Sequence, residues 1–182
     1  MSYEYSFWYS CFHLLIKNEN KEDVIKFLDS ILVCLSDIRV FNNIRYQMKN
    51  INRNNIIGSM KAIKNKTSNM TIYVSESDGK EIWGKQLWDI LFCSGVSCNS
   101  YEKIKAFKNA IKFLKVILTC EDCRANFIRN CKTLNINYFD KDAHSLTYWL
   151  YKIKMYADSE SSEDYNPPYF NTVYNKYLKM IH

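Results

Sequence analysis

Apolar residues recur at helical spacing along most of the chain, in runs that short polar segments separate. The first run is rich in aromatic residues and extends from Phe7 to Ile16. After a polar break, apolar residues return at spacings of three and four from Val24 to Leu35, which is typical of an amphipathic helix. Asn20 or Asp23 could cap the start of that helix.

The second part of the chain repeats this pattern and extends it. Residues 42 to about 80 are polar and Asn-rich, with Met70–Val74 as a short strand or extended segment and Ser75–Lys80 as a linker. The helices predicted after this linker span Trp83–Leu91, Ile104 to about Cys120, 121–131 and Tyr169–Ile181. Before the last of these, a further helix that Asp142 can cap carries Leu146, Trp149, Leu150 and Ile153.

Composition agrees with a helical fold. The chain holds 4 glycines and 2 prolines, and turn-rich β architectures use more of both. Its 182 residues suffice for one ordinary domain or two small ones, and a hydrophobic content of 47% is enough for a core. The sequence therefore predicts an all-α protein.

The two long helices resemble each other residue by residue. Ile25–Cys34 and Ile111–Cys120 share seven of ten residues, at a spacing of 86 positions. Upstream of them, an aromatic pair in the first half mirrors a pair in the second: Trp8 and Phe12 correspond to Trp88 and Phe92. This similarity indicates an internal duplication.

The copies differ at one chemically important position. Asp37 stands in the first copy where Cys123 stands in the second, so only the second copy has two cysteines three residues apart. We therefore predict a degenerate helical pseudo-domain over residues 1–75, without a dithiol, and a functional domain over residues 80–182.

Charge and the N-terminal sequence bear on partners and location. The net charge is +6, and basic residues mostly alternate with acids. The densest basic stretch, Arg45 to Lys66, is interpreted as a solvated loop or helix face, and no nucleic-acid partner is expected. Met1–Glu4 shows no signal-peptide pattern, and no apolar stretch reaches membrane-span length. These features predict a cytoplasmic protein that is not secreted.

The Cys120-Glu121-Asp122-Cys123 segment is the strongest candidate for chemistry. Two cysteines at this spacing can form a reducible disulfide or supply half of a zinc site. Zinc would need further ligands, for which Cys93, Cys98 and His144 are candidates, but their spacing is not that of a standard zinc knuckle. A thioredoxin-like site is disfavoured because a helix, not a strand, precedes the motif. Metal binding is therefore not expected.

A redox-active dithiol needs an electron acceptor. A dithiol passes an electron pair to oxygen poorly without a flavin or metal, so a flavin held between helices would complete the site. Aromatic side chains could form its walls, although each could equally be ordinary core: Trp83, Trp88, Phe92, Phe127, Tyr148 and Trp149.

Four segments together resemble one enzyme family. Trp83–Phe92, Cys120–Phe127, Tyr148–Asp158 and Tyr165–Tyr177 resemble, in order and spacing, the Erv/ALR-family sulfhydryl oxidases, especially the short forms of large DNA viruses. The layout, a degenerate copy before an active one, resembles the baculovirus-type enzymes. The resemblance implies cofactor contacts at Gly84, Trp88, Phe92, Asn126, Phe127, Trp149, Lys154 and Asp158.

The resemblance also implies a fold and a reaction. We expect an Erv-like bundle of four to five helices that binds FAD, with Cys120 nearer solvent and Cys123 beside the flavin. Electrons from protein dithiols would pass through Cys120 and Cys123 to FAD and then to O2, giving H2O2. Expected partners are dithiol-containing proteins, with a thioredoxin-like intermediary or virion proteins among them. A homodimer or an internal pseudo-dimer is expected, in the host cytoplasm, nucleus or virion if the protein is viral.

This chain departs from the family pattern at flavin-binding positions. Histidines of the family correspond here to Phe92, Asn126 and Lys154, and two asparagines to Met155 and Asp158. A non-enzymatic structural relative with a decayed flavin site is therefore the main alternative, and a zinc-clipped helical adaptor is a lesser one.

Overall fold

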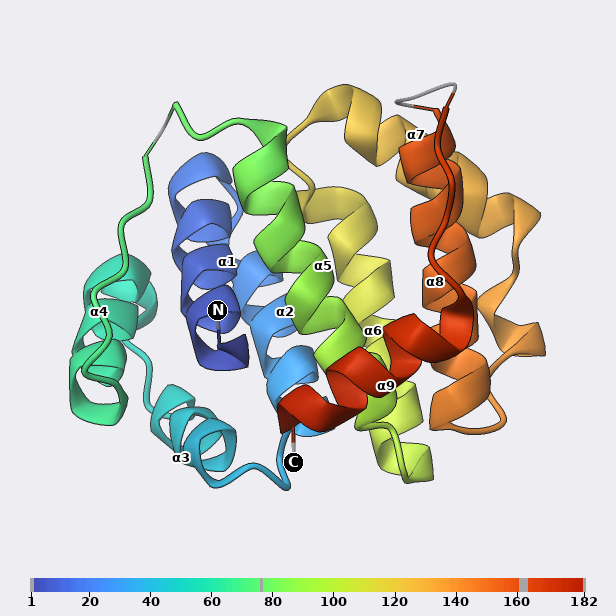
Figure 1. The fold of residues 1–182 in the computed structure, drawn as a ribbon. Coiled ribbons are helices and arrows are strands. Elements are labelled where there is room, and N and C mark those ends of the chain that lie inside the picture. Colours follow the sequence, from blue (N-terminus) through green and yellow to red (C-terminus); the bar gives the residue numbers. More distant parts are fainter. Residues whose placement is uncertain (1, 76, 161–163, 182) are drawn as a thin grey trace.

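The computed structural model describes residues 2–75, 77–160 and 164–181, and within these ranges the protein is helical without strands (Figure 1). This confirms the predicted all-α class. Two 3-10 turns, Arg53–Asn55 and Ile136–Tyr138, accompany the α-helices. The α-helices are α1 (Tyr3–Lys17), α2 (Lys21–Cys34), α3 (Arg39–Met48), α4 (Ile56–Thr67), α5 (Lys80–Val96), α6 (Tyr101–Ile117), α7 (Glu121–Thr133), α8 (Ala143–Ser159) and α9 (Phe170–Ile181).

Polar side chains cap the helix starts as the sequence predicts. Asn20, rather than Asp23, caps α2, because its side-chain oxygen accepts a hydrogen bond of 3.3 Å from the Asp23 backbone N–H. The Asp142 carboxylate caps α8 by accepting from the Ser145 backbone N–H at 2.7 Å. These caps satisfy backbone donors that have no partner within the helix.

Four long helices form the centre of the molecule. α2 packs most extensively against α6, and α1 against α5, so the helices that resemble each other in sequence lie side by side. Figure 1 shows α3 and α4 beside this centre on one side and α7 and α8 on the other, with α9 crossing in front. One continuous apolar core includes residues of both halves, among them Trp8, Phe27, Phe107 and Trp149. The division into two domains stays a prediction.

The polar region of the first half is more ordered than its composition indicates. α3 buries Phe41, Ile44 and Met48, and α4 buries Ile56, Met60 and Ile63, so widely spaced apolar residues suffice to dock two amphipathic helices. The prediction of a short strand at Met70–Val74 is wrong, because this segment has no regular secondary structure. Residues 2–75, which include it, contain no strand with which it could pair.

None of the described helices is both long and apolar enough to cross a membrane.

Truncation of Ile31 in α2 should test the central packing. This side chain is fully buried, so Ile31→Ala should lower the free energy of unfolding by about 2–5 kcal/mol. Urea unfolding followed by circular dichroism measures the change. Val116→Ala on α6 is the matched control, because Val116 is 56% exposed and its truncation should alter stability by less than about 0.5 kcal/mol. Equal effects of the two substitutions would contradict this packing.

Candidate functional site

Cys120 and Cys123 form a disulfide at the start of α7. Cys120 is the cap of this helix, and its sulfur accepts a hydrogen bond of 3.2 Å from the Cys123 backbone N–H. The N-terminus of a helix favours negative charge, so this placement favours the thiolate form when the disulfide is opened. Arg124 donates to the Leu118 carbonyl oxygen at 3.1 Å and so stabilises the turn between α6 and α7.

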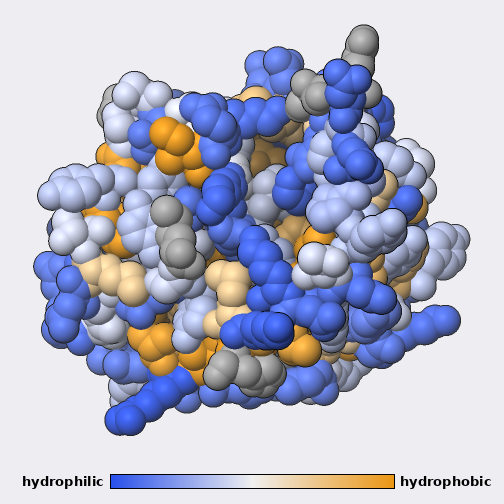
Figure 2. All heavy atoms as spheres, in the orientation of Figure 1, coloured by the Kyte–Doolittle hydropathy of each residue, from blue (hydrophilic) through white to orange (hydrophobic). Residues whose placement is uncertain are grey.

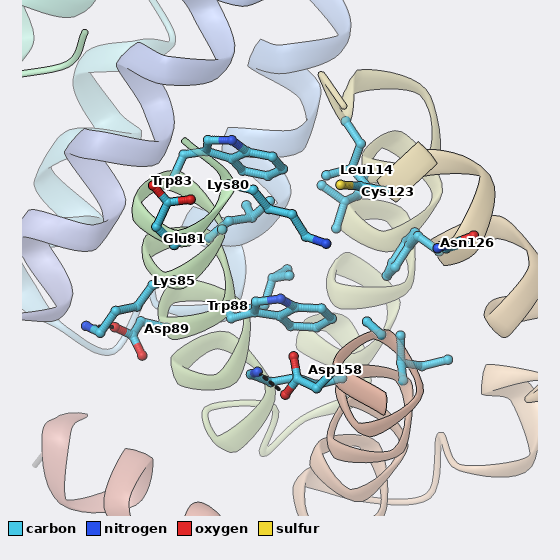
Figure 3. A pocket seen from close by; sticks show the side chains of 18 of the residues that line it. Lys80, Glu81, Trp83, Lys85, Trp88, Asp89, Leu114, Cys123, Asn126 and Asp158 are labelled. Atoms are coloured by element: carbon cyan, nitrogen blue, oxygen red, sulfur yellow. Dashed lines mark hydrogen bonds and ion pairs between the residues drawn. The ribbon is translucent and has the colours of Figure 1, made fainter. Parts of the chain in front are cut away.

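A cavity of about 610 Å³ opens beside this disulfide. Figure 3 shows Cys123 on its wall, with Trp83 and Trp88 of α5 among the surrounding side chains. Cys120 does not line it, so the two sulfurs of one disulfide have different surroundings. In Figure 2, the face that contains α5 and α8 is covered mostly by hydrophilic side chains, with apolar side chains in small patches. The cavity walls come from α5, α7, α8, α9 and the C-terminal end of α6.

Most residues that the sequence nominates for cofactor binding gather around this cavity. Six of them line it together with Cys123: Gly84, Trp88, Asn126, Phe127, Lys154 and Asp158. These residues come from α5, α7 and α8, so three separate motifs converge in space.

The other two nominated residues are buried and do not line the cavity. Phe92 is buried and stacks on Tyr177, with ring centroids 4.7 Å apart, and Tyr177 in turn lines the cavity. Trp149 is fully buried, and its indole N–H donates to the Leu134 carbonyl oxygen at 2.8 Å. Phe92 therefore supports the wall through Tyr177, whereas Trp149 is part of the apolar core.

Lys154 is held in place at the cavity. Its ammonium group donates to the Asp158 carboxylate at 2.5 Å and lies over the Trp88 ring, 5.7 Å from the ring centroid. Lys80, Lys85 and Lys176 also line the cavity. The cavity therefore combines flat apolar walls with several cationic groups, a combination that suits an aromatic ligand carrying phosphates.

Asp89, a buried acidic residue of this cavity, is not among the site residues that the sequence predicts. Asp89 is 6% exposed, accepts a hydrogen bond of 2.6 Å from the Tyr177 hydroxyl, and is contacted by Lys85 at 3.3 Å and by Lys176 at 3.9 Å. Burial, and then the hydrogen bond to Asp89, raises the pKa of Tyr177. The sequence feature that could have identified Asp89 is its position as an acidic residue within the apolar run Trp83–Phe92.

The first half of the chain also reaches the site. His13 of α1 stacks on Trp83 with ring centroids 5.3 Å apart, and its Nε2 lies 3.4 Å from the Thr119 hydroxyl, next to Cys120. The Asn18 side chain donates to the Ile117 carbonyl oxygen at 2.9 Å, at the end of α6. Helix α1 therefore supports both the cavity wall and the turn that leads into the disulfide.

The residues considered for zinc do not assemble into a site. Within residues 2–75, 77–160 and 164–181, no three His, Cys, Asp or Glu side chains are grouped as metal ligands. Cys93 and Cys98 are buried as free thiols, and His144 packs edge-on against Phe170 and Tyr174 at 5.0 Å.

Comparisons with known proteins give a structural relationship only. No family model matches the sequence, and no curated protein sequence does. Among solved structures, the fold is similar to the sulfhydryl oxidase fragment of human QSOX1, with a TM-score of 0.64 and 8% identity, over 97% of this chain and 94% of that chain. This similarity confirms the predicted sulfhydryl-oxidase-like helical fold, and it extends over both halves of the chain.

His13 should make stability depend on pH. Burial, with a contribution from Lys17, lowers the pKa of His13 from about 6.5 to about 4. Between these values the unfolded chain binds a proton that the folded chain does not, so stability is complete above pH 6.5 and decreases as the pH falls toward 4. The expected slope is at most about 1.4 kcal/mol per pH unit.

Urea unfolding from pH 7 to pH 4 measures this slope in wild type and in His13→Gln. The substitution should remove most of the His13 contribution, whereas His144→Gln, at an exposed histidine, should retain it. Parallel pH profiles for wild type and His13→Gln would contradict the assignment.

Proposed function

We propose that this protein is an FAD-linked sulfhydryl oxidase that forms disulfide bonds in protein dithiols. The observation that carries the proposal is the position of Cys123, which belongs to a disulfide at a helix N-terminus and also lines an aromatic, lysine-rich cavity. The fold shared with a sulfhydryl oxidase fragment supports it.

The residues around the cavity fit the chemistry of FAD. A volume of about 610 Å³ is within the range of cofactor sites. Trp83, Trp88 and Phe127 offer flat apolar surfaces for an aromatic ring system, and the lysines offer positive charge for a pyrophosphate. We propose that Lys154, fixed over the Trp88 indole, contributes to binding in place of the family's histidine.

We propose different roles for the two sulfurs, based on their different positions relative to the cavity. A substrate thiolate would attack Cys120 and form a mixed disulfide, because the other sulfur is the one on the cavity wall. Cys123 would leave as a thiolate, which the N-terminus of α7 stabilises. A second substrate thiol would then displace Cys120, releasing the oxidised substrate. When bound, FAD would accept the electron pair from the reduced cysteines and transfer it to O2, giving H2O2.

The proposed substrates are proteins with accessible dithiols, directly or through a thioredoxin-like intermediary. Glu121 and Asp122 between the two cysteines are exposed, so an approaching protein would meet them first. The alternative, a structural relative with a decayed flavin site, predicts no redox activity and no flavin. Asn126 and Lys154 replace histidines of the family, but both still line the cavity with Cys123, and this favours the oxidase.

The two cysteines should differ in their mutant behaviour. Cys120→Ser and Cys123→Ser should each reduce dithiol-dependent oxygen consumption at least about 100-fold, because neither can form the internal disulfide. When incubated with oxidised glutathione, Cys123→Ser should in addition accumulate a mixed disulfide between Cys120 and glutathione, with release of one reduced glutathione, since no internal thiol remains to resolve it. An oxygen electrode and mass spectrometry of the intact protein measure the two effects.

Cys11→Ala is the control, because Cys11 is buried in α1 and remote in sequence from the redox motif. It should retain the activity of wild type. Full activity of Cys123→Ser would exclude the proposed electron route.

Flavin content should be close to one per chain. The cavity lies among the helices of the second half, and residues 1–75 are expected to bind no second FAD. Absorbance of the purified protein near the flavin maximum, relative to protein concentration, measures the ratio. A ratio near two, or a colourless protein after incubation with FAD, would contradict the proposal.

Trp88→Ala should weaken FAD binding at least about 10-fold, because it removes an aromatic wall and the ring beneath Lys154. Titration of the apoprotein with FAD, followed by flavin fluorescence, gives the Kd. Tyr46→Ala serves as the control, since Tyr46 is an exposed aromatic residue on α3.

A further inference from the structure

Two cysteines outside the proposed active site, one from each half of the chain, lie near each other. Cys34 is the last residue of α2, and Cys98 follows the end of α5. Both side chains are fully buried, and both thiols donate to the same acceptor, the Lys103 carbonyl oxygen, at 3.5 Å. Because the two sulfurs share this acceptor, they are close neighbours in the core.

A neighbouring ion pair joins the two segments that follow these cysteines. The Lys103 ammonium group lies 2.5 Å from the Asp37 carboxylate, and its side chain is only 7% exposed. The Asn99 side chain donates to the same carboxylate at 3.3 Å. Asp37 lies three residues after Cys34, and Asn99 immediately follows Cys98, so the ion pair holds together the two segments that carry the cysteines.

The internal duplication adds a second observation. Alignment of Ile25–Cys34 with Ile111–Cys120 places Cys34 at the position of Cys120, and Asp37 at the position of Cys123. The first copy therefore has one cysteine of the redox pair and has lost the partner three residues later. In the folded chain, the Cys98 thiol of the second half lies near Cys34, at the same Lys103 acceptor.

We propose that Cys34 and Cys98 are a structural disulfide site that covalently joins the two halves of the chain. Neither residue lines the cavity or takes part in the proposed oxidase reaction. The bond would close a long loop that contains α3, α4 and α5, and it would restrict the unfolded chain accordingly.

A soluble disulfide such as oxidised glutathione can supply the oxidation. The Cys98 thiolate attacks one glutathione sulfur and releases one reduced glutathione; Cys34 then attacks the Cys98 sulfur and releases the second. The protein loses two thiol protons and two electrons, which the two released glutathione molecules carry. Both thiols are buried in the folded chain, and burial raises the pKa of Cys34, so the reaction takes place before the two halves dock.

Mass spectrometry of the wild-type protein tests the assignment without any substitution. The protein is refolded from denaturant with reduced and oxidised glutathione, then unfolded in acid, treated with N-ethylmaleimide and digested without reduction. A cross-linked peptide pair containing unmodified Cys34 and Cys98 is expected, while Cys11 carries the label. Full labelling of Cys34 and Cys98, or a link from either one to another cysteine, would overturn the proposal.

A stability measurement in a variant without the redox pair separates this proposal from the proposed function. In Cys120→Ser/Cys123→Ser, refolded in the same buffer, dithiothreitol should lower the Tm by about 5 °C or more. Adding Cys34→Ala should abolish this dependence on dithiothreitol, and adding Cys11→Ala should preserve it. A Tm that does not respond to dithiothreitol in the double variant would overturn the structural role, whatever the oxidase assay shows.

Discussion

The packing of α2 against α6 is the contact on which the rest of the structure depends. α6 ends at Ile117, three residues before Cys120, so its position determines where α7 begins and which way Cys123 faces. The central helices bury large side chains almost completely, and close-packed interiors of this kind permit little displacement. The position of the disulfide relative to the cavity is therefore determined by the core, while the motif itself supplies only the reactive atoms.

A second consequence of this packing is the asymmetry of the disulfide. Both sulfurs are half-buried at one helix end, yet only Cys123 shares a cavity with Trp88 and Lys154. A dithiol in uniform surroundings would give no reason for one cysteine to receive the substrate and the other to transfer electrons. Cys123 belongs to the first turn of α7 and lines the cavity together with residues of α5 and α8, whereas Cys120 precedes this turn as its cap.

The sequence predicted the features that periodicity and short motifs encode. Helical spacing gave the fold class and the main helices, and the order of the motifs brought Gly84, Asn126 and Lys154 to one cavity. It did not indicate the contacts of His13 and Tyr177 with the site, because these depend on how distant helices cross. α3 and α4 were missed for a different reason: their apolar residues are few, and tertiary packing supplies the stability that their composition does not indicate.

The contact between α1 and the turn before Cys120 has an evolutionary consequence. On the proposed duplication, the first half has no redox pair of its own on which selection could act, but its His13 and Asn18 still touch Thr119 and Ile117. Selection on this half therefore acts through shape, and we expect its inward-facing side to change slowly while its solvent-facing side drifts. A gene fragment that encodes only the later half would lose this support. We therefore expect the two halves to be inherited together.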